Sequence, residues 1–197
     1  MLRGAYFNFL DPMLENERQR CEEALDRYNN ACKLRNAADA AHREKLLQKV
    51  FDPSLDSLHH PIVQCKEKGV LGPRVKIEAP FTCTYGYNIT LRDDAFIGKN
   101  CNIDDAGAVD IGQRSWIGPN VTIMTTDVSK DMVDRKGWES RWVAKPVYIG
   151  NEVIIGAGAV IYPGVHLAKG STVEPFAIVK HSLGENQTQQ AVMAPRF

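Results

Sequence analysis

Residues 149–179 read IGNEVI-IGAGAV-IYPGVH-LAKGST-VEPFAI-V, and an aliphatic residue opens every block of six. The same spacing recurs from Leu91 to Ile103 and from Ile111 to Ile123. A period of six fits neither an α-helix nor simple strand alternation. It is typical of a β-helix in which each repeat supplies one short strand and one corner. We therefore predict that the aliphatic residues fill a narrow interior and that the glycines following many of them relax the turns.

The composition limits the classes of function. A chain of 197 residues can form one substantial domain with an appendage. Basic and acidic residues balance at 24 each, without a basic run, so we expect no nucleic-acid partner. The apolar runs are shorter than a membrane span and the N-terminus lacks the apolar stretch of a signal peptide, so we expect no membrane partner and a cytoplasmic protein. The five cysteines are widely spaced, which predicts reduced thiols and no metal site.

The chain divides into a helical segment at 1–52, a connector at 53–76 and the β-helix at 77–197. In the first segment, Asp11-Pro12 is a good helix start, and a second helix is predicted from about Ala38 to Phe51. Two short amphipathic helices cannot form a core alone, so they should pack on the β-helix or on a neighbouring subunit. The connector contains three prolines and little periodicity.

Two interruptions break the six-residue period. Between Ile103 and Ile111 the spacing widens from six to eight, so two extra residues should bulge out around Asp105. Between Ile123 and Ile149 the period is lost, and residues 124–146 are predicted to leave the β-helix as a long surface loop. A long loop in a compact domain is usually functional.

Several segments resemble the maltose and galactoside O-acetyltransferases, a family of hexapeptide-repeat transferases, over nearly the whole chain. The matching segments are Asp11–Leu14 with the two helices, Pro80–Ile89, Ile117–Val121, Lys145–Gly150 and Gly156–Val165. The resemblance implies a mainly β protein: a left-handed parallel β-helix with two N-terminal α-helices and an extruded loop. It also implies a homotrimer with three active sites between subunits, each closed by the long loop of a neighbour. Members transfer acetyl from acetyl-CoA to a sugar hydroxyl, with one histidine as general base.

The chain departs from this family at the base. The family histidine follows the position that opens the long loop, in a Thr-x-x-His-Pro-like turn, and Val128 stands there in this chain. Valine cannot carry a proton, and the chain has no histidine between His60 and His166. Asp127, one residue away, either substitutes for the base or is a solvated loop acid.

The predicted substrate-binding set combines family positions with aromatic residues of the loop. It comprises Asn8, Thr84, Tyr85, Tyr87, Gly98, Asn100, Met124, Trp138 and Trp142. Asn8 and Thr84 replace acidic residues of the family, and Gly98 replaces a sugar-binding asparagine. The two loop tryptophans, with Trp116 nearby in sequence, suggest a hydrophobic lid over a less polar substrate, or else buried trimer contacts. The two tyrosines either donate hydrogen bonds to a ligand or pack under the helices.

The predicted coenzyme-binding set is Ala157, Lys180, His181 and Arg196. By resemblance, Ala157 matches a small residue that lets the pantetheine arm lie along the β-helix. One coil further on, the family's small residues are replaced by Glu174-Pro175-Phe176, which could narrow that groove.

Asp104 and Asp105 are the candidate catalytic groups at the bulge, together with Asp127 in the loop. A carboxylate in a partly apolar cleft can have its pKa raised and act as acid or base. The alternative is that both are turn residues that accept hydrogen bonds from backbone donors.

We predict a repurposed enzyme of small-molecule or secondary metabolism. It would perform non-acetylating acid–base chemistry such as dehydration, isomerisation or cyclisation, without a required cofactor. One alternative is an acetyl-CoA-dependent O-acetyltransferase acting on a hydroxylated small molecule. The other is a non-catalytic trimeric scaffold.

Overall fold

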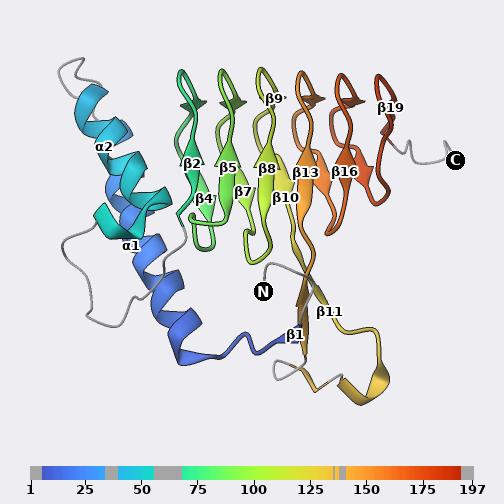
Figure 1. Cartoon of the computed structure of the whole chain (residues 1–197), viewed down its shortest axis with the longest axis horizontal. Coiled ribbons are helices and arrows are strands. Elements are labelled where there is room, and N and C mark those ends of the chain that lie inside the picture. The colour runs from blue at the N-terminus through green and yellow to red at the C-terminus, as the bar shows by residue number, and fades with distance from the viewer. Residues whose placement is uncertain (1–5, 34–39, 56–67, 135, 138–140, 192–197) are drawn as a thin grey trace, which may run out of the picture.

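The computed structural model describes residues 6–33, 40–55, 68–134, 136–137 and 141–191. Two helices lie at one end of a left-handed parallel β-helix, and an antiparallel hairpin leaves its side (Figure 1). This arrangement confirms the predicted fold class. None of the described helices is both long and apolar enough to cross a bilayer.

The two helices cover the open end of the β-helix. Helix α1 (Pro12–Lys33) begins where predicted, because the Oδ1 atom of Asp11 accepts a hydrogen bond of 2.8 Å from the N–H of Met13. Helix α2 (Ala40–Phe51) is followed by the 3₁₀ turn η2 (Pro53–Leu55). The buried faces of both helices join the same apolar core as the β-helix interior, which supplies the burial that neither helix has alone.

The β-helix has three faces, each a parallel sheet. The first face contains β2 (Val70–Leu71), β5 (Ile89–Leu91), β8 (Val109–Ile111), β13 (Val147–Ile149) and β16 (His166–Leu167). The second face contains β3 (Lys76–Ile77), β6 (Phe96–Ile97), β9 (Trp116–Ile117), β14 (Ile154–Ile155), β17 (Thr172–Val173) and β19 (Thr188–Gln189). The third face contains β4 (Phe81–Cys83), β7 (Cys101–Ile103), β10 (Thr122–Ile123), β15 (Val160–Ile161) and β18 (Ile178–Val179).

The aliphatic residues of the six-residue period stack in columns inside these faces. On the second face, Ile97 pairs with Ile117, and Ile117 pairs with Ile155, all fully buried. On the third face, Ile123 pairs with Ile103 and Ile161 in the same way. The residues that repeat every six positions are therefore the ones that pair between neighbouring strands, so the sequence period sets the register of the sheets.

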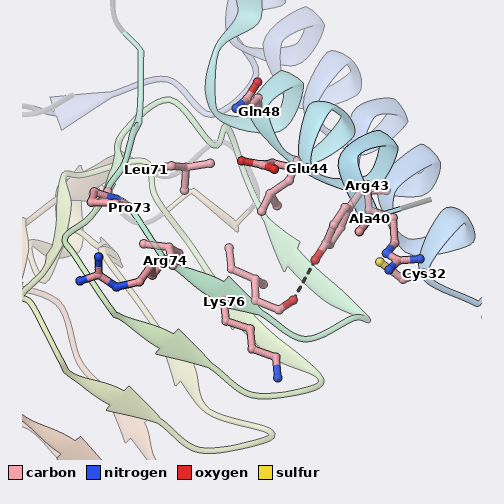
Figure 2. Close-up of a pocket in the computed structure, with 14 residues that line it drawn as sticks. Cys32, Ala40, Arg43, Glu44, Gln48, Leu71, Pro73, Arg74 and Lys76 are labelled. Atoms are coloured by element: carbon pink, nitrogen blue, oxygen red, sulfur yellow. Dashed lines mark hydrogen bonds between the residues drawn. The ribbon is translucent and has the colours of Figure 1, made fainter. Parts of the chain in front are cut away.

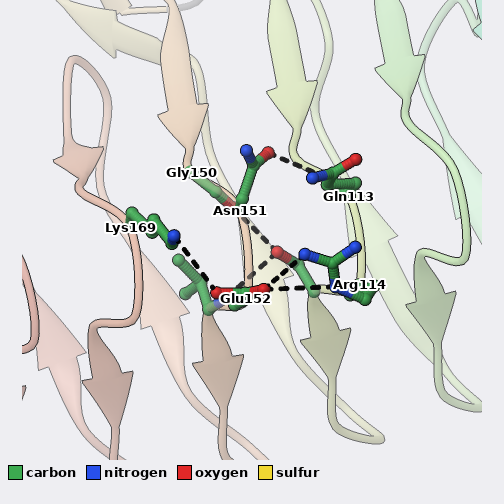
Figure 3. A network of polar contacts seen from close by, with 8 residues as sticks. Gln113, Arg114, Gly150, Asn151, Glu152 and Lys169 are labelled. Carbon is green, nitrogen blue, oxygen red and sulfur yellow. Dashed lines mark hydrogen bonds and ion pairs between the residues drawn. The ribbon is translucent and has the colours of Figure 1, made fainter.

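Three corners join the faces. The first corner connects the first face to the second, the second corner connects the second to the third, and the third corner connects the third to the first face of the next coil. At the first corner, Arg114 and Lys169 both pair with Glu152, the lysine at 3.6 Å, and the Ser115 hydroxyl donates to the carbonyl of Gly150 (Figure 3). These contacts link one coil to the next along the axis.

The long insertion is an antiparallel hairpin rather than an irregular loop. It leaves the third corner as β11 (Thr126–Val128), passes the 3₁₀ turn η3 (Met132–Asp134) and returns as β12 (Trp142–Ala144). The N-terminal strand β1 (Tyr6–Phe7) pairs with β12 and completes a three-stranded sheet beside the β-helix (Figure 1). The returning strand of the insertion is thus paired on one side with β11 and on the other with a segment distant in sequence.

The β-helix begins earlier than the sequence indicated. Strand β2 pairs with β5, so the first coil starts at Val70, within the range assigned to the connector. Leu71 and Ile77 keep the six-residue spacing, but Pro73 and the lack of earlier repeats hide it. The pair His59-His60 lies outside the described residues.

Candidate functional site

The third corner brings the bulge, the start of the hairpin and the N-terminal half of α1 together. A small apolar cluster, separate from the main core, contains Tyr85, Tyr87, Ala106 and Ala144, with Phe7 and Leu14 packed against it. Tyr85 is fully buried and Tyr87 is 8% exposed. Both rings therefore form the packed base of this region, and a ligand could meet only their edges.

Asp105 lies under this corner with no exposed surface. Its carboxylate accepts hydrogen bonds from the backbone N–H groups of Thr84 (2.9 Å), Tyr85 (2.8 Å), Gly86 (2.8 Å) and Asn88 (3.4 Å). Burial raises the pKa of Asp105 to about 6, and the amide donors oppose that rise. The geometry favours the alternative in which this carboxylate holds a turn, because a substrate cannot reach it.

Asp104 is half-buried and is also occupied by local donors. Its Oδ2 accepts from the amides of Thr125 (3.2 Å) and Thr126 (2.9 Å) and from the Thr126 hydroxyl. Its Oδ1 accepts from the amide of Ala106 (3.3 Å) and lies 3.5 Å from the Thr84 hydroxyl. Asp104 thereby fastens the first residues of the hairpin to the bulge.

Asp127 and Val128 point to opposite faces of β11, because consecutive side chains alternate in a strand. In the hairpin, Asp127 is opposite Val143 and Val128 is opposite Trp142. Asp127 Oδ1 accepts from the amide of Val128 at 2.8 Å. Thr126 shares the face of Val128, whereas Asp127 lies on the opposite face.

Arg18 of α1 ties the N-terminal segment to this corner. Its guanidinium donates to the carbonyl of Phe9 (2.8 Å) and to the hydroxyl of Tyr85 (3.1 Å), and it pairs with Glu15. It also lies 4.1 Å from the centre of the Phe9 ring, and that ring lies 5.3 Å from the ring of Trp142. Neither Arg18 nor Phe9 could be recognised from the sequence, because they contact Tyr85 and Trp142, which are distant from them in the chain.

The side chain of Trp142 lies in the hairpin, away from Trp116. Its indole Nε1 is buried and donates no hydrogen bond among the described residues. Trp116, in contrast, lies on the second face, stacked on Phe96 at a centroid distance of 6.0 Å. Trp116 therefore does not join Trp142 in a lid, and Trp138 lies outside the described residues.

A groove of about 340 Å³ runs beside Arg18, between α1 and the first coil. Its walls are Arg18, Glu22, Leu25, Asp26, Asn29 and the strand residues Thr82, Cys83 and Thr84. A second cavity, of about 600 Å³, lies between the helices and the first corner (Figure 2). Beside it, the Tyr28 hydroxyl donates to the carbonyl of Ile77 at 2.8 Å. The second cavity contains none of the predicted site residues.

The remaining substrate-binding candidates are divided between two corners. Met124 is half-buried at the third corner, and Asn8 is exposed, with its Oδ1 accepting from the amide of Leu10 at 3.0 Å. Gly98 and Asn100 lie at the second corner, at the opposite edge of the third face. A Cβ atom on Gly98 would lie 2.7 Å from the backbone nitrogen of Pro119, so this position has no room for a side chain.

The coenzyme-binding candidates are divided in the same way. Ala157 is half-buried at the second corner, whereas Lys180 and His181 are exposed at the third corner. The Nζ atom of Lys180 lies 5.3 Å from the centre of the Tyr162 ring. Arg196 lies outside the described residues.

Phe176 lies one coil after Gly158 at the second corner. It has a φ of 61° and is 76% exposed. A Cβ atom on Gly158 would lie 2.6 Å from its ring, so the ring covers that glycine. The ring thus covers Gly158, and the Phe176 amide donates to the carbonyl of the neighbouring Ala157 at 2.8 Å. Across the described ranges, no three His, Cys, Asp or Glu side chains are grouped as metal ligands.

Family models match three parts of the chain. The maltose acetyltransferase hexapeptide capping motif matches residues 1–54, the hexapeptide repeat of succinyl-transferase matches 89–125, and the bacterial transferase hexapeptide (six repeats) matches 146–181. Nodulation protein L of Rhizobium meliloti (strain 1021) is 34% identical over 84% of this chain and 78% of its own length.

Solved structures share the fold over almost the whole chain. A galactoside acetyltransferase in complex with coenzyme A is 26% identical, with a TM-score of 0.78 over 96% of this chain and 83% of that chain. A maltose O-acetyltransferase from Clostridium difficile 630 has the same TM-score of 0.78 at 24% identity, over 95% of this chain and 88% of that chain. The overall fold is thus shared with these structures over nearly the whole chain.

Proposed function

Because the chain belongs to the maltose and galactoside O-acetyltransferase-like family of hexapeptide-repeat proteins, we propose that it is an acetyl-CoA-dependent O-acetyltransferase acting on a hydroxylated, partly apolar small molecule. The site would lie at the third corner, under the hairpin. A neighbouring copy of the chain would complete it.

The observation that carries this proposal is that Asp104 and Asp105 already accept hydrogen bonds from neighbouring backbone amides. A repurposed enzyme that uses either of these two carboxylates for acid–base chemistry needs that carboxylate to reach a substrate. Asp105 is fully buried under four backbone donors, and both oxygens of Asp104 accept hydrogen bonds from its own surroundings. These carboxylates therefore hold the backbone of the third corner in place. That structural role is compatible with an acetyltransferase.

The class of acceptor follows from the side chains around Val128. Trp142 and Phe9 pack together beside it, with their ring centroids 5.3 Å apart. The groove beside Arg18 adds the polar side chains of Thr82 and Thr84. Such walls suit an acceptor with hydroxyl groups on one side and an apolar body on the other.

Acetyl-CoA would supply an activated thioester. In the transfer, the acceptor oxygen attacks the carbonyl carbon, the C–S bond breaks, and the hydroxyl proton ends on the leaving thiolate. A histidine base normally accelerates this proton transfer by about 10²–10⁴-fold. Val128 cannot do so, and we propose that the Thr126 hydroxyl, oriented by Asp104, only positions the acceptor hydroxyl. Turnover is then slow, and its acceleration comes from holding the acceptor hydroxyl close to the thioester in the right orientation.

The test is to restore the base. We expect Val128→His to raise acetyl transfer to a panel of hydroxylated acceptors by about 10²–10⁴-fold, measured as release of free CoA. Val143→His is the matched control, because Val143 lies opposite Asp127 on the other face of the hairpin and should give no gain. An unchanged rate in Val128→His, with acetyl-CoA bound, would overturn the proposal.

A second candidate is the repurposed enzyme without acetyl transfer, and Phe176 favours it. Its ring covers Gly158 at the corner where Ala157 lies, as expected if the coenzyme groove has closed. Calorimetric titration with acetyl-CoA, and with free CoA as a control, separates the two candidates.

Binding of acetyl-CoA below roughly 100 µM, about −5.5 kcal/mol, supports the acetyltransferase. Heat in Phe176→Gly but not in the original protein would mean that the ring blocks the groove and would favour the repurposed enzyme. Glycine suits this position because the φ of 61° is free of strain for it.

We also propose a cytoplasmic homotrimer in small-molecule metabolism. Gly98, Asn100 and Ala157 lie at one edge of the third face, while Thr84 and the bulge lie at the other edge. A second copy beside the first would bring the two edges together into one cleft. The non-catalytic scaffold remains the alternative, and it requires that substitutions in the cleft leave the biological role intact.

A further inference from the structure

Two cysteines meet where α1 packs on the first coil. The Sγ atoms of Cys21 and Cys83 lie 3.6 Å apart, although the residues are 62 positions apart in the chain. Cys21 is fully buried in α1, and Cys83 is half-buried at the end of β4. The thiol of Cys21 also approaches the carbonyl of Cys83, at 3.7 Å.

The two sulfurs differ in access. Cys83 lines the groove of about 340 Å³ beside α1, so a small reagent in the groove can reach it. Cys21 lies behind it, against the core. A disulfide needs its sulfurs about 2.05 Å apart, so the two side chains must rotate to bring the sulfurs from 3.6 Å into bonding distance.

We propose that Cys21 and Cys83 form a redox modification site, at which a small-molecule disulfide such as glutathione disulfide creates an intramolecular disulfide between α1 and β4. In the first step, the Cys83 thiolate attacks one sulfur of the reagent, forms a mixed disulfide and releases one glutathione. In the second step, Cys21 attacks the Cys83 sulfur and releases the second glutathione. The two cysteines lose two electrons and two protons in total, and the glutathione disulfide gains them.

The environment of Cys83 determines how fast the disulfide forms. Burial raises the pKa of the Cys83 thiol well above its ordinary value, and the neighbouring Cys21 thiol adds to the rise. The thiolate is the attacking species, so the pair stays reduced near neutral pH unless the reagent is abundant. The rate of closure should therefore increase as the pH rises.

The bond would fix the wall of the candidate cleft. Cys21 is less than one helical turn from Arg18, and Cys83 directly precedes Thr84, whose amide donates to Asp105. A link across 62 residues also restricts the unfolded chain. Oxidised protein should therefore unfold about 5–10 °C above the reduced form.

The test uses the full-length protein with glutathione disulfide at pH 7 and pH 9, followed by mass spectrometry of peptides without reduction. We expect one peptide pair linked through Cys21 and Cys83, formed faster at pH 9 and reversed by dithiothreitol. In Cys21→Ser, glutathione should remain attached to Cys83, because the second thiol is missing. Cys101→Ser is the matched control: its buried thiol donates to the carbonyl of Gly118 at 3.1 Å, and the link should form as in the original protein.

Absence of the linked pair after prolonged incubation at pH 9 would overturn the proposal. So would an unchanged melting temperature after the link has formed. A glutathione adduct on Cys21 instead of Cys83 would contradict the order of attack. Cys21→Ala replaces Cys21→Ser if a buried hydroxyl destabilises the helix junction.

Discussion

At the scale of single residues, Asp105 shows how one carboxylate can organise a functional corner. It accepts four backbone N–H groups from Thr84, Tyr85, Gly86 and Asn88. In Asp105→Asn the amide nitrogen would face one or more of these donors and leave them unpaired. We expect the free energy of unfolding to fall by about 1–3 kcal/mol in urea titrations. Asp127 is half-buried and its carboxylate accepts one local hydrogen bond, from the amide of Val128. Asp127→Asn should therefore lower the free energy of unfolding by less than about 1 kcal/mol.

The same carboxylate predicts a pH dependence of stability. Its pKa of about 6 in the folded protein lies above the value of about 3.9 for an unfolded aspartate. The folded state therefore binds the proton more tightly, and this group's contribution is fully present below about pH 4 and lost as the pH rises through about 6. The full change is about 3 kcal/mol.

Urea titrations between pH 4 and pH 7 would isolate this contribution. The difference in stability between the original protein and Asp105→Asn should be largest at the acidic end. A difference that stays constant over this range would show that Asp105 does not titrate there.

At the scale of elements, the junction of α2 with the third corner depends on Gly86. It has a φ of 81°, and a Cβ atom there would overlap the carbonyl oxygen of Val50 in α2. Gly86→Ala should therefore lower the free energy of unfolding by more than about 2 kcal/mol. Gly137→Ala is the matched control, since its φ is 61° but, apart from its chain neighbours, no atom of the described residues lies within 4 Å of the added Cβ. It should cost about 1–2 kcal/mol, from backbone strain alone.

At the scale of the whole molecule, the exposed apolar side chains indicate assembly. Trp116 and Ile154 are neighbours on the second face, 41% and 49% exposed, and Phe176 and Ile178 continue around the second corner. We expect sedimentation to give the mass of three 22.0 kDa chains, because such a patch is unfavourable in water.

A charge in this patch tests the interface. Ile154→Asp should shift the trimer toward the monomer at micromolar concentration. Tyr148→Asp, at a 46% exposed residue on the first face, is the control that should leave the mass unchanged. Dissociation by both substitutions, or by neither, would place the interface elsewhere.

Much of the fold could be predicted from the sequence. The stacked pairs Ile97–Ile117 and Ile117–Ile155 repeat the six-residue spacing directly, because each coil of a solenoid contacts only its neighbours and local rules suffice. The start of α1 at Asp11-Pro12 was equally readable, since a helix cap is a local contact. The first coil at Val70 was missed because prolines mask a single repeat.

The site was less predictable, because its chemistry depends on contacts between distant segments. Whether Asp105 reaches a substrate is decided by the turn at Thr84–Asn88, which folds over it from the preceding coil. The direction of the Asp127 side chain is set by the pairing of β11 with β12. The position of β12 is set in turn by its pairing with β1, near the N-terminus.

The sequence by itself determined the β-helix, its two helices and the position of the insertion. Those features follow from local periodicity and residue identity. Only the tertiary structure decided that both bulge carboxylates hold turns, that Phe176 covers Gly158 and that Cys21 meets Cys83. Each of these contacts joins different coils or elements, and a one-dimensional pattern carries no information about the distance between them.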